Sequence, residues 1–424
     1  MPHASPAAGG RIAFAHNLRG IAALLVAIAH LVLMFWANPA YTSVLVNAPA
    51  YPGPAIAAFQ WLSSHLPLAP AHLGVALFFL ISGFVIPFSF QRQRTLPFLV
   101  ARFFRLWPIY ACGLGITLLS LWFTALWFQR PYTLPVEAVG AHLLMLRDVL
   151  RQPSLDGIVW TLEIEVKFYL LCALLAPWLR RGRVEPLIAI GLGSLLLTLF
   201  TTPVNVTLVL NHPRNFALLC ILELHGIMIP FMLIGTVFHF HYRGHVSTRE
   251  GVMLGGLLLA CVLGQWPLGV LGDGRQSGPP NYLVALGLFA GCYVLRDWLG
   301  TWRVLERLAD ISYPLYVIHG FVGYCYMRVF VSVWDRPLLA LGSCLVAVLT
   351  LAYGMHRLIE APCNALGKKL AGRLETWLPR GRGGVPLLSN LTRLSASTGP
   401  VTVQDTERPE DADGTYGAVS RPAA

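Results

Sequence analysis

Long apolar segments alternate with short basic connections over most of the chain. A helix needs about 20 mainly apolar residues to cross a bilayer. Segments near this length lie at residues 18–37, 73–90, 106–128, 158–179, 184–202, 216–240, 251–271, 281–295, 312–331 and 337–359. The pattern predicts an all-α fold, a polytopic membrane helical bundle of about ten transmembrane helices.

Arginine residues indicate how this bundle is oriented. Clusters of them occupy alternate connections, at residues 92–105, 180–183, 243–249, 296–307 and 357–373. Connections rich in Lys and Arg face the cytoplasm, so both termini of a ten-helix protein are expected there, in a multi-pass protein of the inner cell membrane. Only 12% of the 424 residues are charged, against about 25% in soluble domains. The formal net charge of +11 therefore reflects membrane orientation, and no nucleic-acid partner is expected.

Several regions fall outside the predicted spans. Residues 1–366 make up the predicted membrane domain, and residues 367–424 are expected to form a cytoplasmic, largely disordered tail because they are poor in apolar residues. A short surface helix is expected in the Pro-rich connection after the first span, and a short surface or re-entrant helix at 138–150. Eight scattered Cys residues without metal-ligand spacing predict neither a zinc site nor disulfides.

The first span carries two polar residues that a lipid-facing helix would not favour, Arg19 and His30. They are 30 − 19 = 11 residues apart. At about 100° per residue this is three turns plus roughly 20°, so both are expected on one helix face. An ionisable residue inside a membrane helix marks a functional site by default. The alternative for His30 is a single hydrogen bond at a helix–helix contact.

Three charged residues, Glu163, Glu165 and Lys167, stand together in the fourth span. Glu163 and Lys167 are four residues apart, in the order that favours an ion pair within one helix, and we predict that this pair is structural. Glu165 is about 200° away around the helix. It therefore needs another partner, for which His30, Arg19 and the arginines of the third span are the candidates.

Other polar residues in or near the spans have more than one interpretation. Arg102 and Arg105 are three residues apart and share a helix face. They suit phosphate groups, or they anchor the helix on the cytoplasmic side. His319 is either a partner of the site or a packed histidine. Glu223 and His225 lie on different faces of the sixth span, so each is expected to meet another helix.

Six segments occur in an order typical of one family: LRGIAALLVAIAH, GVALFFLISGF, RFFRLWPIY, WTLEIEVKFYLL, ISYPLYVIH and IEAP. Over about residues 12–367 the chain resembles the membrane acyltransferase-3 family, which transfers acyl groups, often acetyl, to cell-envelope sugars and related acceptors. The family's Arg-x10-His motif falls on Arg19 and His30. Its Arg-x-x-Arg motif falls on Arg102 and Arg105, and its acid falls on Glu165.

The resemblance is incomplete around these motifs. His16 stands where the family often has an acidic residue, and Ala76 stands where an acid is often found in the second span. Ala101 and Ala361 stand in place of arginines. These differences concern the acceptor more than the type of reaction.

The first hypothesis is an integral-membrane O-acyltransferase with acyl-CoA, acetyl-CoA in the expected case, bound by Arg19, Arg102 and Arg105 on the cytoplasmic side. The alternative for Arg19 is that it fixes the helix end at the level of the lipid phosphates. The acceptor would be a hydroxyl of a carbohydrate or lipid-linked sugar, arriving from the other side or from the membrane lipid. His30 would act as general base or carry the acyl group itself, with Glu165 in the site and no metal. The alternatives are a proton-coupled transporter that uses intramembrane His and Glu residues and a non-catalytic scaffold.

Overall fold

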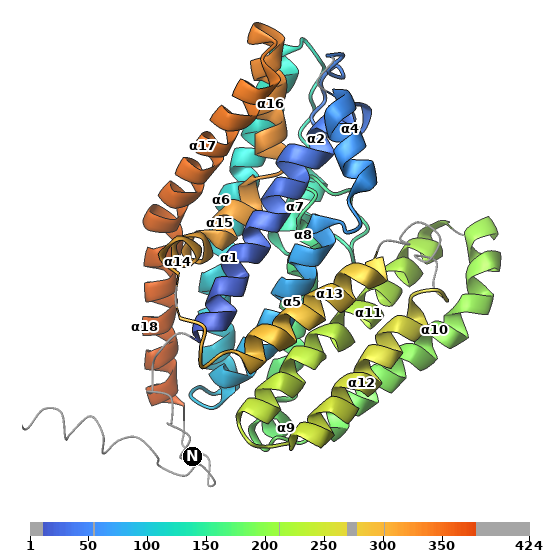
Figure 1. Ribbon diagram of the computed structural model, residues 1–424, viewed down its shortest axis with the longest axis vertical. Helices are drawn as coiled ribbons and strands as arrows, with labels where there is room; N and C mark the ends of the chain where they lie inside the picture. Colours follow the sequence, from blue (N-terminus) through green and yellow to red (C-terminus); the bar gives the residue numbers. More distant parts are fainter. Residues whose placement is uncertain (1–11, 54–55, 212, 269–277, 301, 379–424) are drawn as a thin grey trace, which may run out of the picture. The chain divides into compact units, whose positions relative to one another are not determined.

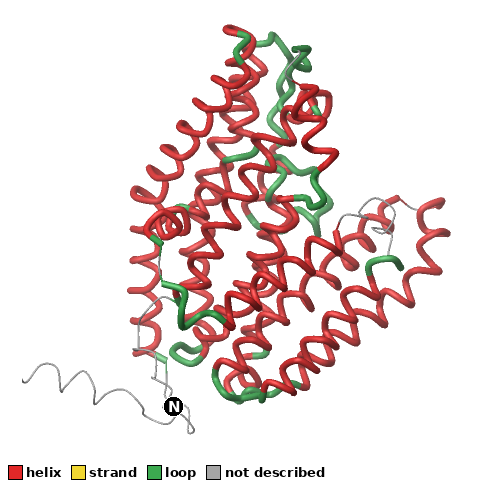
Figure 2. Tube along the Cα trace, viewed as in Figure 1, coloured by secondary structure: helices red, strands yellow, loops and turns green. Residues whose placement is uncertain are grey.

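Helices make up all the regular structure of the described chain (Figure 1). The computed structural model describes residues 12–53, 56–211, 213–268, 278–300 and 302–378. Figure 2 shows helices joined by loops, and no strand occurs among these residues. The all-α fold predicted from the apolar segments is therefore confirmed.

The helices fall into two size groups. The longer ones are α1 (Ala13–Ile28), α5 (Pro70–Phe90), α6 (Thr95–Trp127), α8 (Val159–Leu174), α10 (Glu185–Asn211), α11 (Pro213–Tyr242), α12 (Thr248–Gln265), α13 (Gly278–Val294), α16 (Phe321–Trp334), α17 (Pro337–Met355) and α18 (Ala361–Trp377). The shorter ones are α2 (Phe35–Ala37), α3 (Pro39–Leu45), α4 (Ile56–His65), α7 (Val136–Leu143), α9 (Ala176–Arg180), α14 (Arg303–Asp310) and α15 (Ser312–Ile318). Two π-helical turns complete the set, η1 (Ala29–Met34) and η2 (His356–Glu360).

The first predicted span is a single helical rod in which α1, η1 and α2 follow one another without a gap. The residues at both joins keep helical backbone angles. The rod packs against α5 on one side and against α14 and α15 on another. It is therefore central to the helical unit, and any polar group on it is within reach of several helices.

Glycines let neighbouring helices approach closely. A Cβ atom on Gly20 of α1 would lie 2.6 Å from the carbonyl oxygen of Leu305 in α14. Gly83 of α5 and Gly235 of α11 face each other in the same way, because a Cβ atom on either would overlap with the backbone of the other helix. Small residues at such contacts are typical of membrane helices, which associate by close packing rather than by a hydrophobic drive.

Five helices of the described residues are long and apolar enough to cross a membrane. They are Ala13–Ala37, Pro70–Phe90, Thr95–Trp127, Leu219–Tyr242 and Pro337–Trp377. A sixth candidate is the pair α15 and α16, which qualifies as a unit but bends by 56° at its break. These helices indicate a membrane protein. The predicted number of ten spans and the cytoplasmic position of both termini stay predictions.

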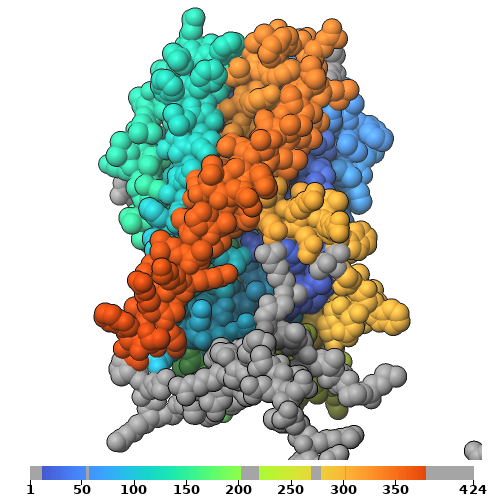
Figure 3. Space-filling view, turned by 90° about the vertical axis from the view of Figure 1, so that its left-hand side faces the viewer, coloured from blue at the N-terminus to red at the C-terminus, as the bar shows by residue number. Residues whose placement is uncertain are grey.

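The surface of the C-terminal helices fits a lipid environment. Figure 3 shows α17 and α18 lying along one face of the helical unit. Apolar side chains of α17 and η2 are more than half exposed there, among them Leu338, Val346, Tyr353 and Leu358. Large exposed apolar patches are rare on soluble proteins and mark interaction or membrane surfaces.

The helical unit continues past the boundary predicted at residue 366. The last helix, α18, runs to Trp377, where the compact unit also ends. An ion pair joins Arg94, just before α6, to Glu375 near the end of α18, with a nitrogen–oxygen distance of 3.2 Å. Residues 379–424 lie outside the described residues, so the predicted disordered tail stays a prediction.

Candidate active site

Two histidines from distant parts of the chain meet inside the helical unit. His30 lies in η1, and His319 follows α15 directly. The Nδ1 atom of His30 and the Nε2 atom of His319 are 3.2 Å apart, and the two rings meet edge to face. π-Helical turns are frequent at functional sites. His319 is therefore a hydrogen-bonding partner of His30 and is also buried in the helical unit, so both interpretations of its sequence position agree with the structure.

Backbone carbonyl groups determine which ring nitrogens carry protons. The Nδ1 atom of His30 lies 2.9 Å from the carbonyl oxygen of Val26, and that of His319 lies 2.8 Å from the carbonyl oxygen of Tyr316. A carbonyl oxygen only accepts hydrogen bonds, so each Nδ1 donates. Neutral His319 then presents the lone pair of its Nε2 atom to His30, whose single Nδ1 proton is shared between the carbonyl oxygen of Val26 and Nε2 of His319. By this assignment the Nε2 atom of His30 keeps a free lone pair and can accept a proton.

A break in the ninth predicted span sets the position of His319. The helix α15 ends at Ile318 and α16 begins at Phe321, with a bend of 56° between them. Gly320 in the break has φ −69° and ψ −94°, which is not a helical conformation. The break leaves His319 at the end of α15, where its ring contacts η1.

The polar face predicted for the first span is directed toward α15. Arg19 donates from Nε to the Oγ atom of Ser312 at 2.9 Å, and His30 contacts His319. Ser312 and His319 are seven residues apart, which is about two helical turns. Arg19 and His30 therefore lie on one face, as their spacing predicts.

Arg102 is held by a hydroxyl group and two aromatic rings. Its Nη2 atom donates to the Oγ atom of Ser89 at 2.7 Å. Its guanidinium carbon lies 5.2 Å from the ring centre of Phe98 and 5.5 Å from that of Tyr169, within cation–π range. These contacts orient the group without neutralising its charge.

The three predicted donor-binding arginines form one group. Arg19 and Arg102 each interact electrostatically with Arg105 and with Glu165. In the part of the chain that the structure describes, no ion pair joins any of these arginines to a carboxylate. The result is a cluster of three positive charges near Glu165, with Glu360 as a second acid that acts on Arg19. Positive charge remains in excess, which favours a negatively charged ligand.

Glu165 lies with the arginines. Its Oε1 atom accepts a hydrogen bond from the hydroxyl of Tyr169 at 2.5 Å and another from that of Ser82 at 3.3 Å. No hydrogen bond joins Glu165 to His30 among the described residues. Of the candidate partners for this acid, the structure therefore brings arginines near it.

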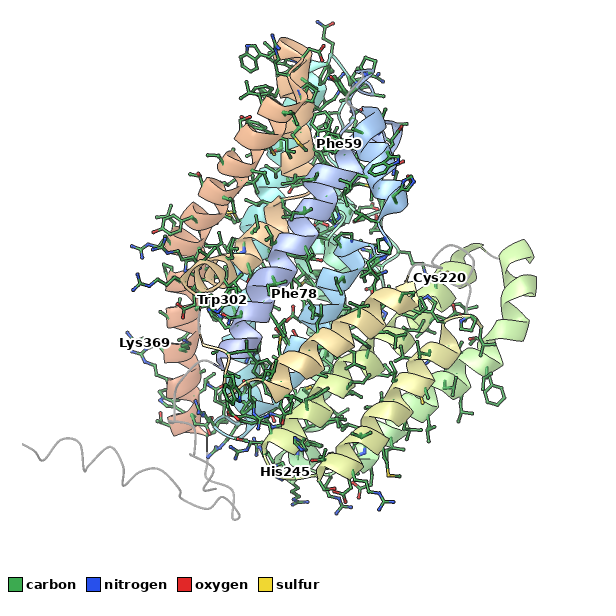
Figure 4. The ribbon with its side chains drawn as sticks, viewed as in Figure 1. Phe59, Phe78, Cys220, His245, Trp302 and Lys369 are labelled. Atoms are coloured by element: carbon green, nitrogen blue, oxygen red, sulfur yellow. The ribbon has the colours of Figure 1, made fainter. Side chains whose placement is uncertain are left out.

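Tyr316 lies between the two histidines and the arginine cluster that surrounds Glu165. Its hydroxyl is 2.6 Å from the Oγ1 atom of Thr161, and its ring centre is 5.7 Å from that of His319. The ring also contacts Phe78 of α5, which Figure 4 labels near the middle of the helical unit. Electrostatic interaction with Glu165 completes the link. Tyr316 is not among the residues predicted from the sequence, although it precedes His319 by three residues, about one helical turn.

The predicted ion pair between Glu163 and Lys167 is wrong. Glu163 is fully buried and pairs with the Nη2 atom of Arg147 at 2.8 Å, and it also accepts from the backbone N–H of Asp148 at 2.9 Å. Lys167 pairs with Asp148 instead. His225, for which the sequence predicted contact with another helix, lies 3.4 Å from the same carboxylate.

Glu163 and Lys167 do not pair with each other because the connection before α8 supplies other partners. Spacing within one helix cannot predict partners that come from another segment. This connection is anchored by Asp156, which accepts hydrogen bonds from the backbone N–H groups of Ile158 and Val159, both at 3.0 Å. The hydroxyl of Tyr110 in α6 donates to the same carboxylate at 2.8 Å. The anchored connection covers the start of α8 and brings charged side chains against it.

The site combines a proton acceptor with a group of cations. The Nε2 atom of His30 can take a proton from a hydroxyl, and the arginines can bind phosphate groups. Among the described residues, no three His, Cys, Asp or Glu side chains are placed to hold a metal ion. The expectation that no metal takes part stays an expectation. This combination suits group transfer to a hydroxyl from a donor that carries phosphate.

Comparison with known families defines the class of protein. Residues 12–357 match the family described as the acyltransferase domain. The chain belongs to this family, the acyltransferase-3 family, which confirms the resemblance seen in six sequence segments. Membership supports acyltransferase activity and favours it over the transporter and scaffold hypotheses.

One relative is similar over most of its length. Nodulation protein 10 of Rhizobium leguminosarum bv. viciae is 23% identical over 335 residues, which is 74% of this chain and 87% of that protein. No solved structure matches the chain. The relative supports the family, and its similarity is too low to transfer a substrate.

Proposed function

We propose that this protein is an integral-membrane O-acyltransferase of the inner cell membrane, with ten spans and both termini in the cytoplasm. It moves an acyl group, acetyl in the simplest case, from acyl-CoA to a hydroxyl of a carbohydrate or lipid-linked sugar. The observation that carries the proposal is the hydrogen-bonded pair of His30 and His319, which leaves the Nε2 atom of His30 as an acceptor.

The arginine cluster is the proposed binding site for acyl-CoA. Coenzyme A carries several phosphate charges, and guanidinium groups bind phosphate in a bidentate manner. Arg19, Arg102 and Arg105 have no carboxylate ion pair among the described residues, so their charge is available to a ligand. Glu165 would moderate the repulsion among them and hold them in place.

The reaction follows from the free lone pair on His30. The Nε2 atom removes the proton from the acceptor hydroxyl, whose oxygen then forms a bond to the thioester carbonyl carbon. The carbon–sulfur bond breaks, and the leaving thiolate takes the proton back from His30. A second route uses the same atom as a nucleophile, so that an acyl-imidazole forms first and the hydroxyl attacks it.

The test is an assay of the purified full-length protein in lipid nanodiscs with acetyl-CoA labelled in its acetyl group. A panel of envelope sugars serves as acceptors, and both transfer and thioester hydrolysis are measured. We expect transfer to at least one sugar, and rapid acid quenching shows whether a labelled acyl-enzyme comes first. If neither transfer nor hydrolysis occurs in folded protein, the proposal is wrong.

A further inference from the structure

A small pocket lies beside α2 and α3, where α16 also contributes to the lining. Its lining residues include Phe35, Thr42, Tyr51 and Arg328. In Figure 1 the labels α2 and α16 stand toward the opposite end of the helical unit from the start of α1. The pocket is therefore a separate place from the arginine cluster around Arg19.

Arg328 is a buried cation that no carboxylate of the described residues pairs with. The residue belongs to α16 and is only 7% exposed. The Nε atom donates to the carbonyl oxygen of Pro49 at 2.5 Å, and the guanidinium lies 4.5 Å from the ring centre of Phe128. No carboxylate forms an ion pair with it among the described residues. Burying a charge in this way is costly unless a partner compensates for it.

The acid that follows α16 already has a partner. Asp335 accepts a hydrogen bond from the hydroxyl of Tyr51 at 2.7 Å. Burial, together with this bond, raises the pKa of Tyr51 to about 12, so the hydroxyl keeps its proton. Arg328 thus lines the pocket with unused hydrogen-bonding capacity, since a guanidinium has five N–H donors.

Aromatic residues connect the pocket to His30. Phe35 lies five residues after His30 on the same rod, about 7.5 Å along a helix axis. Its ring stacks on that of Tyr324 at 5.8 Å, and the ring of Tyr324 is 6.5 Å from that of His30. The hydroxyl of Tyr324 and the Nε1 atom of Trp36 are buried without a hydrogen-bond partner in the described part of the chain. Such unpaired donors are costly in a finished core and suit a bound polar molecule.

We propose that Arg328 binds a compact anionic group of the acceptor, a carboxylate or a phosphate, so that a hydroxyl on the adjoining part of the same acceptor meets Nε2 of His30. This inference rests on the proposed acyl transfer and adds the substrate class: an acidic glycan rather than a neutral one. Tyr324, between the two residues, would donate a hydrogen bond to the acceptor.

Direct binding tests this without relying on catalysis. The full-length protein in nanodiscs is titrated calorimetrically with methyl glucuronide, glucose 1-phosphate and methyl glucoside. We expect measurable binding of one anionic sugar, with the carboxylate and phosphate arms showing which anion fits, and no binding of the neutral sugar. Arg328→Gln should weaken that binding about 10- to 100-fold. The matched control Arg336→Gln, at an exposed arginine two residues after the end of α16, should leave it unchanged.

Transfer kinetics separate this inference from the proposed function. Arg328→Gln should raise KM for the anionic acceptor and leave the KM for acetyl-CoA unchanged. Anion binding that depends on Arg328 in a folded protein that shows neither transfer nor thioester hydrolysis would overturn the proposed function and keep the pocket assignment. Equal transfer to neutral and anionic sugars would overturn the pocket assignment and keep the function.

A purely structural role for Arg328 has a different signature. If Arg328→Gln lowers the melting temperature, Arg328→Lys retains the positive charge and serves as the second variant. Recovery of anion binding with Arg328→Lys supports the proposal. If Arg328→Lys is as stable as the unaltered protein and still does not bind the anion, Arg328 only supports Pro49 and the inference is wrong.

Discussion

Two acids on α8, separated by one residue, have opposite surroundings. Glu163 is fully buried, paired with Arg147 and bonded to a backbone N–H group. Glu165 is partly exposed, accepts hydrogen bonds from two hydroxyl groups, and lies near arginines without pairing to them. The same helix therefore carries one acid whose charge is compensated within the protein and one whose surroundings remain positive.

This difference separates charges that stabilise the fold from charges that can act on a ligand. A buried ion pair is strongly destabilised when one partner is removed, because the other charge remains buried. An acid held by hydroxyl groups can be neutralised at smaller cost, and its effect passes to the arginines beside it. Substitution of Glu163 should therefore reduce the amount of folded protein, and substitution of Glu165 should reduce activity.

The largest effect is expected at His30. Like Glu165, it is expected to affect activity rather than folding. His30→Ala should reduce acyl transfer by about 10²–10⁴, the usual cost of losing a general base. Folded protein, measured by size-exclusion chromatography, should be unchanged. His65→Ala, at an exposed histidine of α4, is the control, and transfer by His30→Ala within a few-fold of the unaltered protein would contradict the assignment.

The two acids themselves give the next effect. Glu163→Gln should lower the free energy of unfolding by about 3 kcal/mol, the low end for a broken buried pair, because it leaves Arg147, whose side chain is 20% exposed, without its partner. Glu165→Gln should reduce transfer about 10- to 100-fold with little change in melting temperature, since it disturbs charged contacts at the site. Melting curves and single-turnover transfer rates on the same preparations check both.

A double substitution sharpens this result. Glu163→Gln with Arg147→Met removes both members of the buried pair and should recover much of the lost stability. Glu163→Gln with Lys167→Met should recover none, because Arg147 still lacks its partner and Asp148 loses Lys167. An active Glu165→Gln beside an inactive but well-folded Glu163→Gln would mean that the two acids have the opposite roles.

A smaller effect is expected at the arginines that Glu165 accompanies. Arg102→Ala or Arg105→Ala should raise the KM for acetyl-CoA about 10- to 100-fold, since a charge-assisted contact contributes about 1.5–3 kcal/mol. The KM for the acceptor should not change, and Arg181→Ala, at an exposed arginine directly after α9, should change neither KM. An altered acceptor KM with an unaltered donor KM would contradict phosphate binding.

The smallest effect is expected at His319, which positions His30 through one hydrogen bond. Removing a neutral bond of about 1 kcal/mol predicts roughly a five-fold loss of kcat in His319→Phe. His319→Gln keeps an acceptor oxygen and should restore part of that loss, with KM unchanged in both variants. Equal losses in the two variants would indicate that the residue only fills space.

Helical periodicity correctly predicted which residues share a face of one helix. It did not predict which residues pair across different segments. The shared face of Arg19 and His30 follows from 11 residues at about 100° each, and the structure confirms it through Ser312 and His319. The Glu163–Lys167 pair used the same rule and is wrong, because the connection anchored by Asp156 supplies closer partners.

The contact between the two histidines could not be derived from spacing either. It depends on the break after His319, and the sequence there reads as one continuous span from 312 to 331. Gly320 is the local signal, since glycine tolerates unusual backbone angles. Glycine is nevertheless common in membrane helices, so it does not identify a break by itself.

The short helix α15 also has a consequence for how related sequences change with time. Ser312 and His319 each contact one polar residue of the first span, so two contacts between the same two helices depend on residues far apart in the chain. A substitution at one member of either pair changes which residue types are tolerated at the other position. In an alignment of relatives, the positions of Arg19 and Ser312, and those of His30 and His319, are therefore expected to vary together rather than independently.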